Sequence, residues 1–569
     1  MVDRFSVHAP TANRVSLFIH SSRTLTVSET VMTRQLEGPR WGCDAAAGDG
    51  DIYWYVVDGV GPLLDPDAKD VVMTADGARS VVRSSWPMQR SLGRHRADPI
   101  VYELHVRGFG RTFAGCVEHL PYLAELGVNV VELMPVHPFD TSDNYWGYMP
   151  LVWGAVHRPY AAGDDAPAEL AALVAAAHAH DIEVWLDVVF NHTAEADPTK
   201  PTLSLRGFDD ANAYLHRADG TYNDDSGTGN VSNPGDSNIQ QLVLTALARF
   251  ADLGIDGFRF DLASLLTRDG GGLVDRITEW GARRDVRLVA EPWDLAAYQL
   301  GHWKDPWLQW NDRFRDDVRG FVRGEPGLVS AVIQRVQGSP DLFPGGSAPS
   351  VNFLTAHDGL TMNDLTVLTS DHHHSWDSGD SLRMQQLKNY FTMLLLSAGT
   401  PMFVMGDEFA RTQGGLDNPY NIDSEVTWVD WNRLHAWAEL HDFVQALLRL
   451  RGSHPPRDFT FYGAQSTPDS STESRSLAWS AGGLYVMVNA WWEPVSFEFQ
   501  EPGPWGLALS TSGASGPSSG ASATIVQPRS ALVWVSEQIG PKVPFGSASV
   551  SFRIPKEPPA LRPQSNPKA

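Results

Sequence analysis

The chain has 569 residues, of which 42% are hydrophobic and 20% charged, and its net charge is -24 at pH 7. This length exceeds that of one ordinary domain, and the composition is that of a globular protein with ample core. The acidic balance argues against nucleic acid and anionic membrane as main partners, because clustered Lys and Arg bind both. A neutral polymer such as a glucan is compatible with it.

Several features bear on the compartment. Cysteine occurs only at Cys43 and Cys116, which mildly favours a reducing environment. The first residues, MVDRFSVHAP, lack the basic flank and apolar run of a signal peptide. The longest apolar-rich run, residues 391–404, is interrupted by serine, glycine and proline, so no transmembrane helix is predicted. We therefore expect a cytoplasmic protein, and the sequence leaves its oligomeric state open.

The first part of the chain, residues 1–95, predicts a small β-sandwich. Runs rich in β-branched and aromatic residues, such as SLFIH (16–20) and IYWYVVDG (52–59), are separated by Gly, Pro and Asp clusters. The same pattern returns in residues 456–538, where a C-terminal β-sandwich is expected. Residues 539–569 are rich in Pro and Lys, and this tail is expected to be poorly ordered.

Residues 96–455 alternate strand-like and helix-like runs, which predicts an α/β fold, a (β/α)8 TIM barrel flanked by the two sandwiches. Near-continuous apolar strands are typical of a parallel sheet buried on both faces. Helices are expected at residues 113–127, 168–181 and 240–254. The expected strands are residues 100–106, 128–136, 182–190, 255–260, 286–291, 309–314, 350–356 and 401–406, and the sixth has the weakest pattern.

One long insertion follows the third predicted strand, at about residues 192–237. It is rich in Asp, Asn and Gly, so we expect an irregular excursion over the cleft. A doubly wound open sheet is the alternative fold. However, no GxGxxG or GxxxxGK[ST] motif follows any strand, so the usual phosphate-binding signatures of such sheets are missing.

Three predicted strands end in an acidic residue: Asp261 in GFRFDLA, Glu291 in AEPWD and Asp358 in TAHDG. Acids are costly where a strand meets a buried core, and catalytic groups of barrels lie at the carboxyl ends of strands. Three such acids therefore indicate one shared cleft. Glycoside hydrolysis with retention needs two carboxyl groups about 5–5.5 Å apart.

The neighbours of two acids favour different protonation states. Arg259 lies two positions before Asp261, on the same strand face, and favours the ionised form that a nucleophile needs. A structural ion pair is an equal interpretation. Pro292 and Trp293 give Glu291 a partly apolar setting, which raises the pKa as a general acid requires. A glutamate that starts a helix is the alternative there.

Other polar residues follow the same strands. In LDVVFNH, Asp187 and Asn191 share one strand face, and His192 lies just past the strand end. Asp187 is expected to fix the side chain of Arg259. For Asn191, a structural role and a role in the site are equal interpretations. His357 can hydrogen-bond sugar hydroxyls, while Asp358 can accept from them.

LDVVFNH, GFRFDLA, AEPWD and TAHDG, in this order, resemble the four signature regions of the α-amylase superfamily, glycoside hydrolase family 13, over roughly residues 98–451. By this resemblance Asp261 would be the nucleophile, Glu291 the acid/base and Asp358 the transition-state stabiliser. The residues implied to bind substrate are Tyr148, His192, Arg259, Trp293 and His357, with Asp187 and Asn191 supporting the site.

Further segments are similar to bacterial glycogen-debranching enzymes of the isoamylase type: NYWGYMP, WNDRFRDDVRGF and MGDEFARTQGGLDNPYNID. YWYVVDGVGPLLDPDAK is similar to the carbohydrate-binding module (family 48) that precedes such barrels. The resemblance implies hydrolysis of α-1,6 branch linkages of glycogen or limit dextrin through a covalent glucosyl-Asp261 intermediate. Branched α-glucan would be the partner, and no cofactor is implied.

Two departures and three alternatives accompany this resemblance. Many α-amylases hold calcium partly through a His four residues after the nucleophile, often preceded by Lys; here Leu265 and Ser264 stand there, so no metal is expected. The motifs leave open α-1,4 hydrolysis or transglycosylation, as in an amylase, a maltooligosyltrehalose trehalohydrolase or a branching enzyme. A catalytically inactive glucan-binding protein is a further hypothesis. DHHHS (371–375) predicts a polar loop, with a glucan contact as the alternative.

Overall fold

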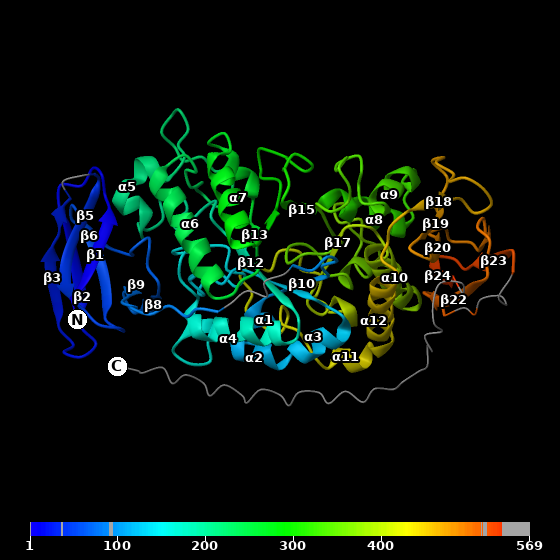
Figure 1. Cartoon of the computed structure of the whole chain (residues 1–569), viewed down its shortest axis with the longest axis horizontal. Coiled ribbons are helices and arrows are strands. Elements are labelled where there is room, and N and C mark those ends of the chain that lie inside the picture. The colour runs from blue at the N-terminus through cyan, green and yellow to red at the C-terminus, as the bar shows by residue number, and fades with distance from the viewer. Residues whose placement is uncertain (1, 36–37, 90–94, 514, 516–520, 537–569) are drawn as a thin grey trace.

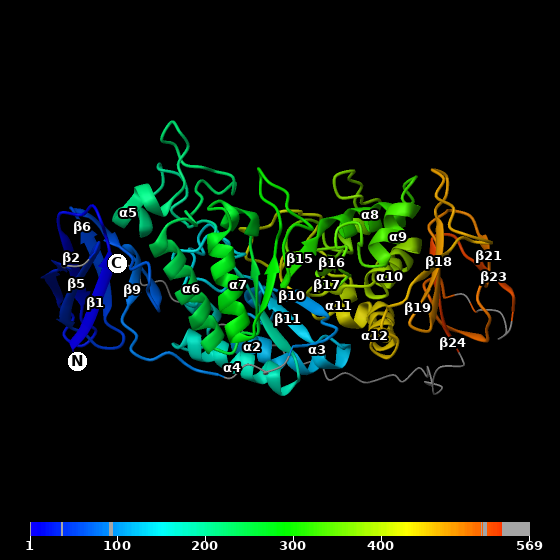
Figure 2. The same cartoon turned by 45° about the horizontal axis from the view of Figure 1, so that its top comes forward.

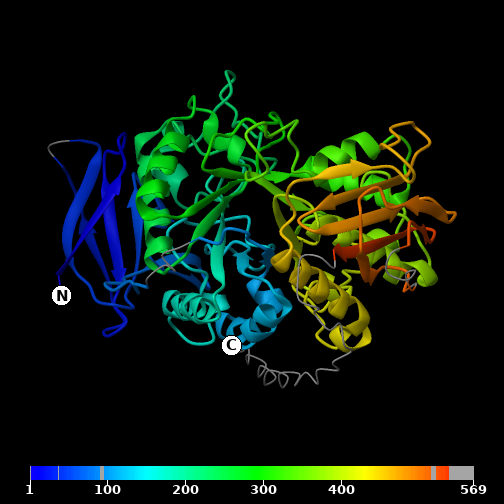
Figure 3. The same cartoon turned by 45° about the vertical axis from the view of Figure 1, so that its right-hand side comes forward.

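The computed structural model describes residues 2–35, 38–89, 95–513, 515 and 521–536. Its parts follow one another along the long axis (Figure 1), with β-rich ends on either side of a central barrel. The same order is visible in the two turned views, Figure 2 and Figure 3. The predicted tail, residues 539–569, lies outside the described residues. None of the helices in these ranges combines the length and apolar character needed to cross a membrane.

The central part is a closed barrel of parallel strands in chain order, in which the last strand pairs with the first. This confirms the predicted barrel fold. The strands are β10 (Val101–Leu104), β11 (Val130–Leu133), β12 (Glu183–Val188), β13 (Gly257–Phe260), β14 (Arg287–Ala290), β15 (Trp307–Asn311), β16 (Ser350–Phe353) and β17 (Thr400–Val404). The sixth strand begins before the predicted 309–314, and residues 312–314 already belong to the next helix.

Helices surround the barrel, and one prediction among them is wrong. The helix expected over residues 113–127 is two short helices, because Pro121 lacks the N–H that a continuous helix would use and starts a new one. The helices are α1 (Val106–Phe109), α2 (Phe113–Glu118), α3 (Leu120–Leu126), α4 (Ala166–Ala179), α5 (Leu205–Ala213), α6 (Ser237–Asp252), α7 (Gly272–Arg284), α8 (Asp312–Arg323), α9 (Val329–Val336), α10 (Asp380–Leu395), α11 (Arg433–Ala436) and α12 (Ala438–Ser453).

The N-terminal part consists of two β-sheets that enclose one core. One sheet has the order β1-β5-β4, with β1 (Val2–His8), β4 (Thr33–Arg34) and β5 (Arg40–Ala46). The other follows β3-β2-β6-β9-β8, with β7 on β6: β2 (Val15–His20), β3 (Val27–Val31), β6 (Ile52–Val57), β7 (Val60–Leu63), β8 (Val71–Thr74) and β9 (Gly77–Val81). Phe208 of α5 packs into this core against Tyr55, at 5.7 Å between ring centroids. The N-terminal part is thereby joined to the insertion.

The C-terminal part repeats the two-sheet plan. A five-stranded sheet, β18-β19-β20-β24-β22, faces the pair β21-β23 across a core that includes Tyr485, Met487 and Phe497. The strands are β18 (Thr460–Tyr462), β19 (Ser476–Ala481), β20 (Leu484–Asn489), β21 (Val495–Glu498), β22 (Trp505–Ser510), β23 (Ala523–Val526) and β24 (Ser530–Ser536).

Arg451, near the end of α12, ties the last barrel helix to the start of the barrel. It is buried, and it donates to both carboxylate oxygens of Asp98 at 3.0 and 2.6 Å. It also donates to the backbone carbonyls of Leu395, Ser397 and Gly399 at 2.9, 2.8 and 2.7 Å. One guanidinium thus holds together α12, the end of α10 and the residues that lead into β10.

Replacing Arg451 with Met should lower the free energy of unfolding by roughly 2–4 kcal/mol, because a carboxylate and three carbonyls lose their donor. Shifts of the urea and thermal midpoints measure this. Arg283→Met is the matched control, because Arg283 and Glu279 form an exposed pair at 3.9 Å and should contribute less than about 0.5 kcal/mol. Equal shifts for both variants would contradict the role given to Arg451.

Candidate active site

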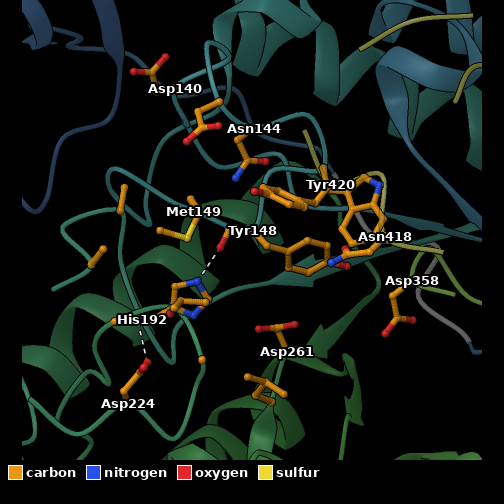
Figure 4. A pocket seen from close by; sticks show the side chains of 18 of the residues that line it. Asp140, Asn144, Tyr148, Met149, His192, Asp224, Asp261, Asp358, Asn418 and Tyr420 are labelled. Carbon is orange, nitrogen blue, oxygen red and sulfur yellow. Dashed lines mark hydrogen bonds between the residues drawn. The ribbon is translucent and has the colours of Figure 1, made fainter. Parts of the chain in front are cut away.

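A cleft of about 1380 Å³ opens where the barrel strands end, and Asp261, Glu291 and Asp358 all line it. Asp261 and Asp358 face the same space as Tyr148 and His192 (Figure 4). Because the carboxyl ends of parallel barrel strands meet at one mouth, acids that are distant in sequence become neighbours. The structure therefore brings the three acids of the sequence analysis into one site.

The inward positions of five strands explain why charged side chains gather at this site. On five consecutive strands, an inward position is apolar or glycine, and the inward position two residues later is charged. These pairs are Val101 and Glu103, Val130 and Glu132, Trp185 and Asp187, Gly257 and Arg259, and Val289 and Glu291. The apolar members Val101, Val130, Trp185 and Val289 pack together. A charged layer thus lies on an apolar floor, at the end of the barrel where the cleft opens.

Arg259 is the centre of the charged layer, with a side chain only 1% exposed. Its Nη1 lies 2.8 Å from Asp187 Oδ2 and 3.1 Å from Asp261 Oδ1, and its Nη2 lies 2.9 Å from Glu291 Oε2. The guanidinium also lies over the Trp310 ring, 4.2 Å from its centroid. Burial opposes the charge, but the Asp187 and Glu291 carboxylates raise the pKa of Arg259 well above its ordinary value.

Asp261 directly follows β13, and two donors fix its carboxylate. Oδ1 accepts from Arg259, and Oδ2 accepts from Asn191 Nδ2 at 2.8 Å. The same amide of Asn191 donates to the backbone carbonyl of Asp261 at 2.7 Å. Asn191 is itself buried, so its amide holds Asp261 in one orientation toward the cleft.

Glu291 follows β14 and is 7% exposed. Its Oε2 accepts from the Leu262 backbone N–H at 2.7 Å and forms an ion pair with Arg259 Nη2 at 2.9 Å. Burial raises its pKa; Arg259 opposes this, the negative charges of Asp261 and Asp358 add to it, and the pKa rises to about 8. Glu291 is therefore protonated at neutral pH.

His357 and Asp358 follow β16 and carry opposite charges. Burial opposes protonation of His357, but Glu103 lies 2.8 Å from its Nδ1 and raises the pKa to about 9. Desolvation opposes the charge of Asp358, but His357, Arg315 and Arg259 lower its pKa below the ordinary value. Asp358 is therefore an exposed carboxylate beside an imidazolium.

Tyr148 and His192 complete the wall next to Asp261. The Tyr148 hydroxyl donates to Asp187 Oδ2 at 2.5 Å, and its ring stacks on His357 at 4.7 Å between centroids. His192 Nε2 lies 2.6 Å from the Tyr148 carbonyl oxygen, which fixes it as the donor nitrogen. Burial lowers the pKa of His192, so it is a neutral ring at pH 7.

Two residues predicted to bind substrate lie apart from the cleft lining, which includes Tyr148, His192 and His357. Arg259 is inward-facing but sits beneath the carboxylates that it binds, so they separate it from the cleft. Trp293 is half-buried and stacks on Tyr298, with 6.4 Å between centroids and planes at 15°. That these two residues bind substrate stays a prediction.

The sequence analysis missed three residues that contact the site or line it: Glu103, which pairs with His357, Trp310, which lies against Arg259, and Arg315, which lines the cleft. Glu103 and Glu132 are both 1% exposed and face each other in the β10–β11 register. A signal was present, because IVYELHV and VNVVELMPV each carry an acid inside an apolar run. An acid at an inward strand position is costly and indicates a functional or paired group.

The histidine loop DHHHS also reaches the cleft, through His372 and His373. His373 Nε2 lies 3.3 Å from Asp417, which follows β17, and a β-bridge between Ser370 and Ser375 closes the loop. The predicted polar loop is present, and its position keeps the alternative of a glucan contact.

A hairpin of the N-terminal part contributes to the wall of the cleft. Met73 on β8 and Gly77 and Ala78 on β9 line the same cleft as Asp261. Met73 is 47% exposed although it is apolar. The cleft is therefore shared between the barrel and the N-terminal sheets.

The position that holds calcium in many α-amylases is apolar here. Leu265 is buried and offers no ligand atom, and the Ser264 hydroxyl donates to Asp294 at 2.6 Å. Across the described residues, no group of three or more His, Cys, Asp or Glu side chains is arranged to hold a metal ion. That this protein needs no metal stays a prediction.

Comparisons with known proteins place these observations in context. Residues 105–237 match the family model described as "Alpha amylase, catalytic domain". A glycogen operon protein GlgX homolog of Mycobacterium bovis is 35% identical over 510 residues, which cover 78% of this chain and 70% of that protein. An isoamylase of Flavobacterium sp. is 32% identical over 616 residues, which cover 82% of this chain and 79% of that protein.

Among solved structures, a pullulanase of Anoxybacillus sp. LM18-11 complexed with maltotetraose is similar, with a TM-score of 0.78 and 25% identity. The match covers 94% of this chain and 86% of that one. The similarity therefore extends beyond the barrel to the β-rich parts on both sides of it.

Proposed function

The chain belongs to the α-amylase family, among the isoamylase and GlgX relatives, and from this premise we propose that it hydrolyses α-1,6 branch linkages of glycogen or limit dextrin. The observation that carries the proposal is the site itself. Asp261 and Glu291 contact the same guanidinium, at 3.1 and 2.9 Å, so the two carboxyl groups are close neighbours. Retaining glycosidases need such a pair.

In the first step, the Asp261 carboxylate attacks C1 of the glucosyl residue at the branch. The bond from C1 to O6 of the main-chain glucose breaks, and Glu291 gives its proton to O6. The product of this step is a glucosyl ester of Asp261. In the second step Glu291, now a carboxylate, takes a proton from water, the water oxygen attacks C1, and the ester bond breaks. Two inversions retain the α configuration.

The other charges of the site fit this reaction. Asp358 is a carboxylate on the exposed side of the cleft, where it can stabilise the positive charge that develops at the sugar ring. His357 lines the cleft and presents Nε2 to sugar hydroxyls, whereas both ring nitrogens of His192 are engaged, by the Tyr148 carbonyl and by Asn191 Oδ1. Arg259 contributes indirectly, by fixing both reacting carboxyl groups. Tyr148 offers the edge or one face of its ring, because His357 covers the other.

We place the protein in the cytoplasm as part of the same proposal. Cys43 and Cys116, the two cysteines of the sequence, are both free thiols, which suits a reducing compartment. Fractionation of cells with antibody detection tests this.

Asp261→Asn should lower turnover of glycogen more than about a thousandfold, because an amide cannot form the ester. Asp140→Asn is the matched control: Asp140 lines the same cleft but is exposed and lies at its rim. Its turnover should stay within about threefold of the parent. The parent protein should release linear chains from glycogen and leave amylose untouched. Undiminished turnover by Asp261→Asn would contradict the mechanism, and cleavage of amylose would contradict the linkage.

The pH profile should report the protonated Glu291. The acid form is needed for the first step, so kcat/KM should persist through neutral pH and fall as pH rises through about 8. A glutamate with an ordinary pKa would lose its proton above about pH 5 instead. Initial rates on a soluble branched oligosaccharide, from pH 4 to 10, separate the two cases. An alkaline limb near pH 5 would contradict the assignment.

The N-terminal wall should affect long substrates only. Met73→Asp should raise KM for glycogen about three- to tenfold, because a charge replaces apolar surface at the cleft wall. Met88→Asp is the control, since Met88 is 79% exposed and is not among the residues that line the cleft. A short branched oligosaccharide should be cleaved equally by both variants and the parent. Equal KM values on glycogen would show that the hairpin makes no substrate contact.

A further inference from the structure

We infer that Glu103, on the first barrel strand, is the positioning residue that holds His357 as an imidazolium with its free nitrogen toward the cleft. This inference rests on the proposed function, because it gives His357 a task in binding the sugar. Glu103 lies in the strand run IVYELHV, outside the four motifs that resemble the amylase signature regions.

The contact between the two residues is direct and buried. Glu103 is 1% exposed and its Oε1 lies 2.8 Å from His357 Nδ1, although the residues are 254 positions apart in the chain. β10 and β16 are both neighbours of β17 in the closed barrel, which brings the two side chains together. With Nδ1 donating to Glu103, Nε2 is the nitrogen left to meet a ligand.

Two aromatic rings fix the plane of the imidazole. Tyr148 stacks on it at 4.7 Å between centroids, and Trp146 meets it edge-on at 5.0 Å and 89°. These contacts restrict tilt, but neither ring carries a counter-charge. Glu103 therefore supplies what the aromatic clamp lacks: a charge that selects the protonated ring and the direction of its Nδ1–H.

Several other charged groups face His357. Asp358 is its neighbour on the same loop, and Arg259 approaches from β13, with opposite effects on the imidazolium. The Tyr148 hydroxyl lies 3.3 Å from Nδ1 and is itself held by Asp187 on β12. Among these groups Glu103 makes the shortest contact, and it is the main influence that favours the charge.

Glu132 offers an internal comparison. It faces Glu103 in the β10–β11 register and is equally buried, but neither of its carboxyl oxygens has a hydrogen-bond partner. Burial and the negative charge of Glu103 raise the pKa of Glu132 well above its ordinary value. Glu103 therefore has an ionic partner in His357, whereas Glu132 has none and favours its neutral form, which a glutamine would mimic.

The test compares Glu103→Gln with Glu132→Gln, two identical substitutions in one layer of the barrel. Glu103→Gln should move the alkaline limb of kcat/KM at least about one unit lower, so that activity at pH 8 falls about tenfold or more. Activity should recover toward the parental value as pH is lowered below 6. Glu132→Gln should leave the profile where it is, within about threefold in rate.

Two further variants separate orientation and charge from folding. Glu103→Asp keeps the charge and should retain the alkaline limb near its parental position, even if KM rises. In a His357→Asn background, Glu103→Gln should add no further shift in pH dependence. Thermal midpoints identify any variant that fails to fold. If Glu103→Gln does not fold, the test is the alkaline limb of Glu103→Asp, which should stay near its parental position.

A drop in kcat/KM by one factor at every pH for Glu103→Gln would overturn the inference, because it would indicate a structural role alone. An equal shift of the limb by Glu132→Gln would also overturn it. Failure of the parent to release chains from glycogen is a different result, which would remove the proposed function itself.

Discussion

One buried guanidinium determines the electrostatics of this site. Arg259 is a single cation among three carboxyl groups, Asp187, Asp261 and Glu291, each within 3.1 Å. One positive charge cannot compensate three buried negative charges, so protons must remain on the acids that are held least well as anions. Burial raises the pKa of Asp187 to about 6 and that of Glu291 to about 8. Glu291, the proposed acid, thus holds its proton more strongly than Asp187 does, although both are simple carboxyl groups.

The barrel lowers the cost of burying these charges, because an apolar or glycine residue lies below each charged side chain on the same strand face. The inward positions one step lower on the strands are Val101, Val130, Trp185, Gly257 and Val289, and most of them pack into a closed hydrophobic cluster. The charges are therefore confined to the end where the cleft opens and where water or substrate can complete their hydrogen bonds. The flanking sheets take part as well, since a hairpin of the N-terminal part forms one wall.

Much of the fold and part of the site could be predicted from the sequence. Near-continuous apolar strands, such as VWLDV in β12, could be recognised. The position of β15 was predicted less well, because Gln309 and Asn311 interrupt its apolar pattern. The prediction of one helix over residues 113–127 was wrong, because a second helix starts at Leu120, just before Pro121. This proline was visible in the sequence. The three acids could be predicted because each follows a barrel strand: Asp261 and Glu291 directly, and Asp358 after the short segment that follows Phe353.

The relations between strands were harder to predict. That Arg259 contacts Glu291 as well as Asp261 depends on the register between β13 and β14, which local patterns do not contain. The pairing of Glu103 with His357 depends on barrel closure in the same way. Trp293 was assigned to the substrate from its place in a motif, whereas its ring direction is set by the turn after Pro292 and by Tyr298.

The most direct measurement is the chemical trapping of the intermediate. In the Glu291→Gln variant, an activated maltosyl fluoride should form the ester, which needs no acid, while hydrolysis lacks its base. Peptide mass spectrometry should then find a maltosyl group on the carboxyl of Asp261 alone. A label on Asp187 or Asp358, or rapid turnover with no labelled peptide, would contradict the division of roles around Arg259.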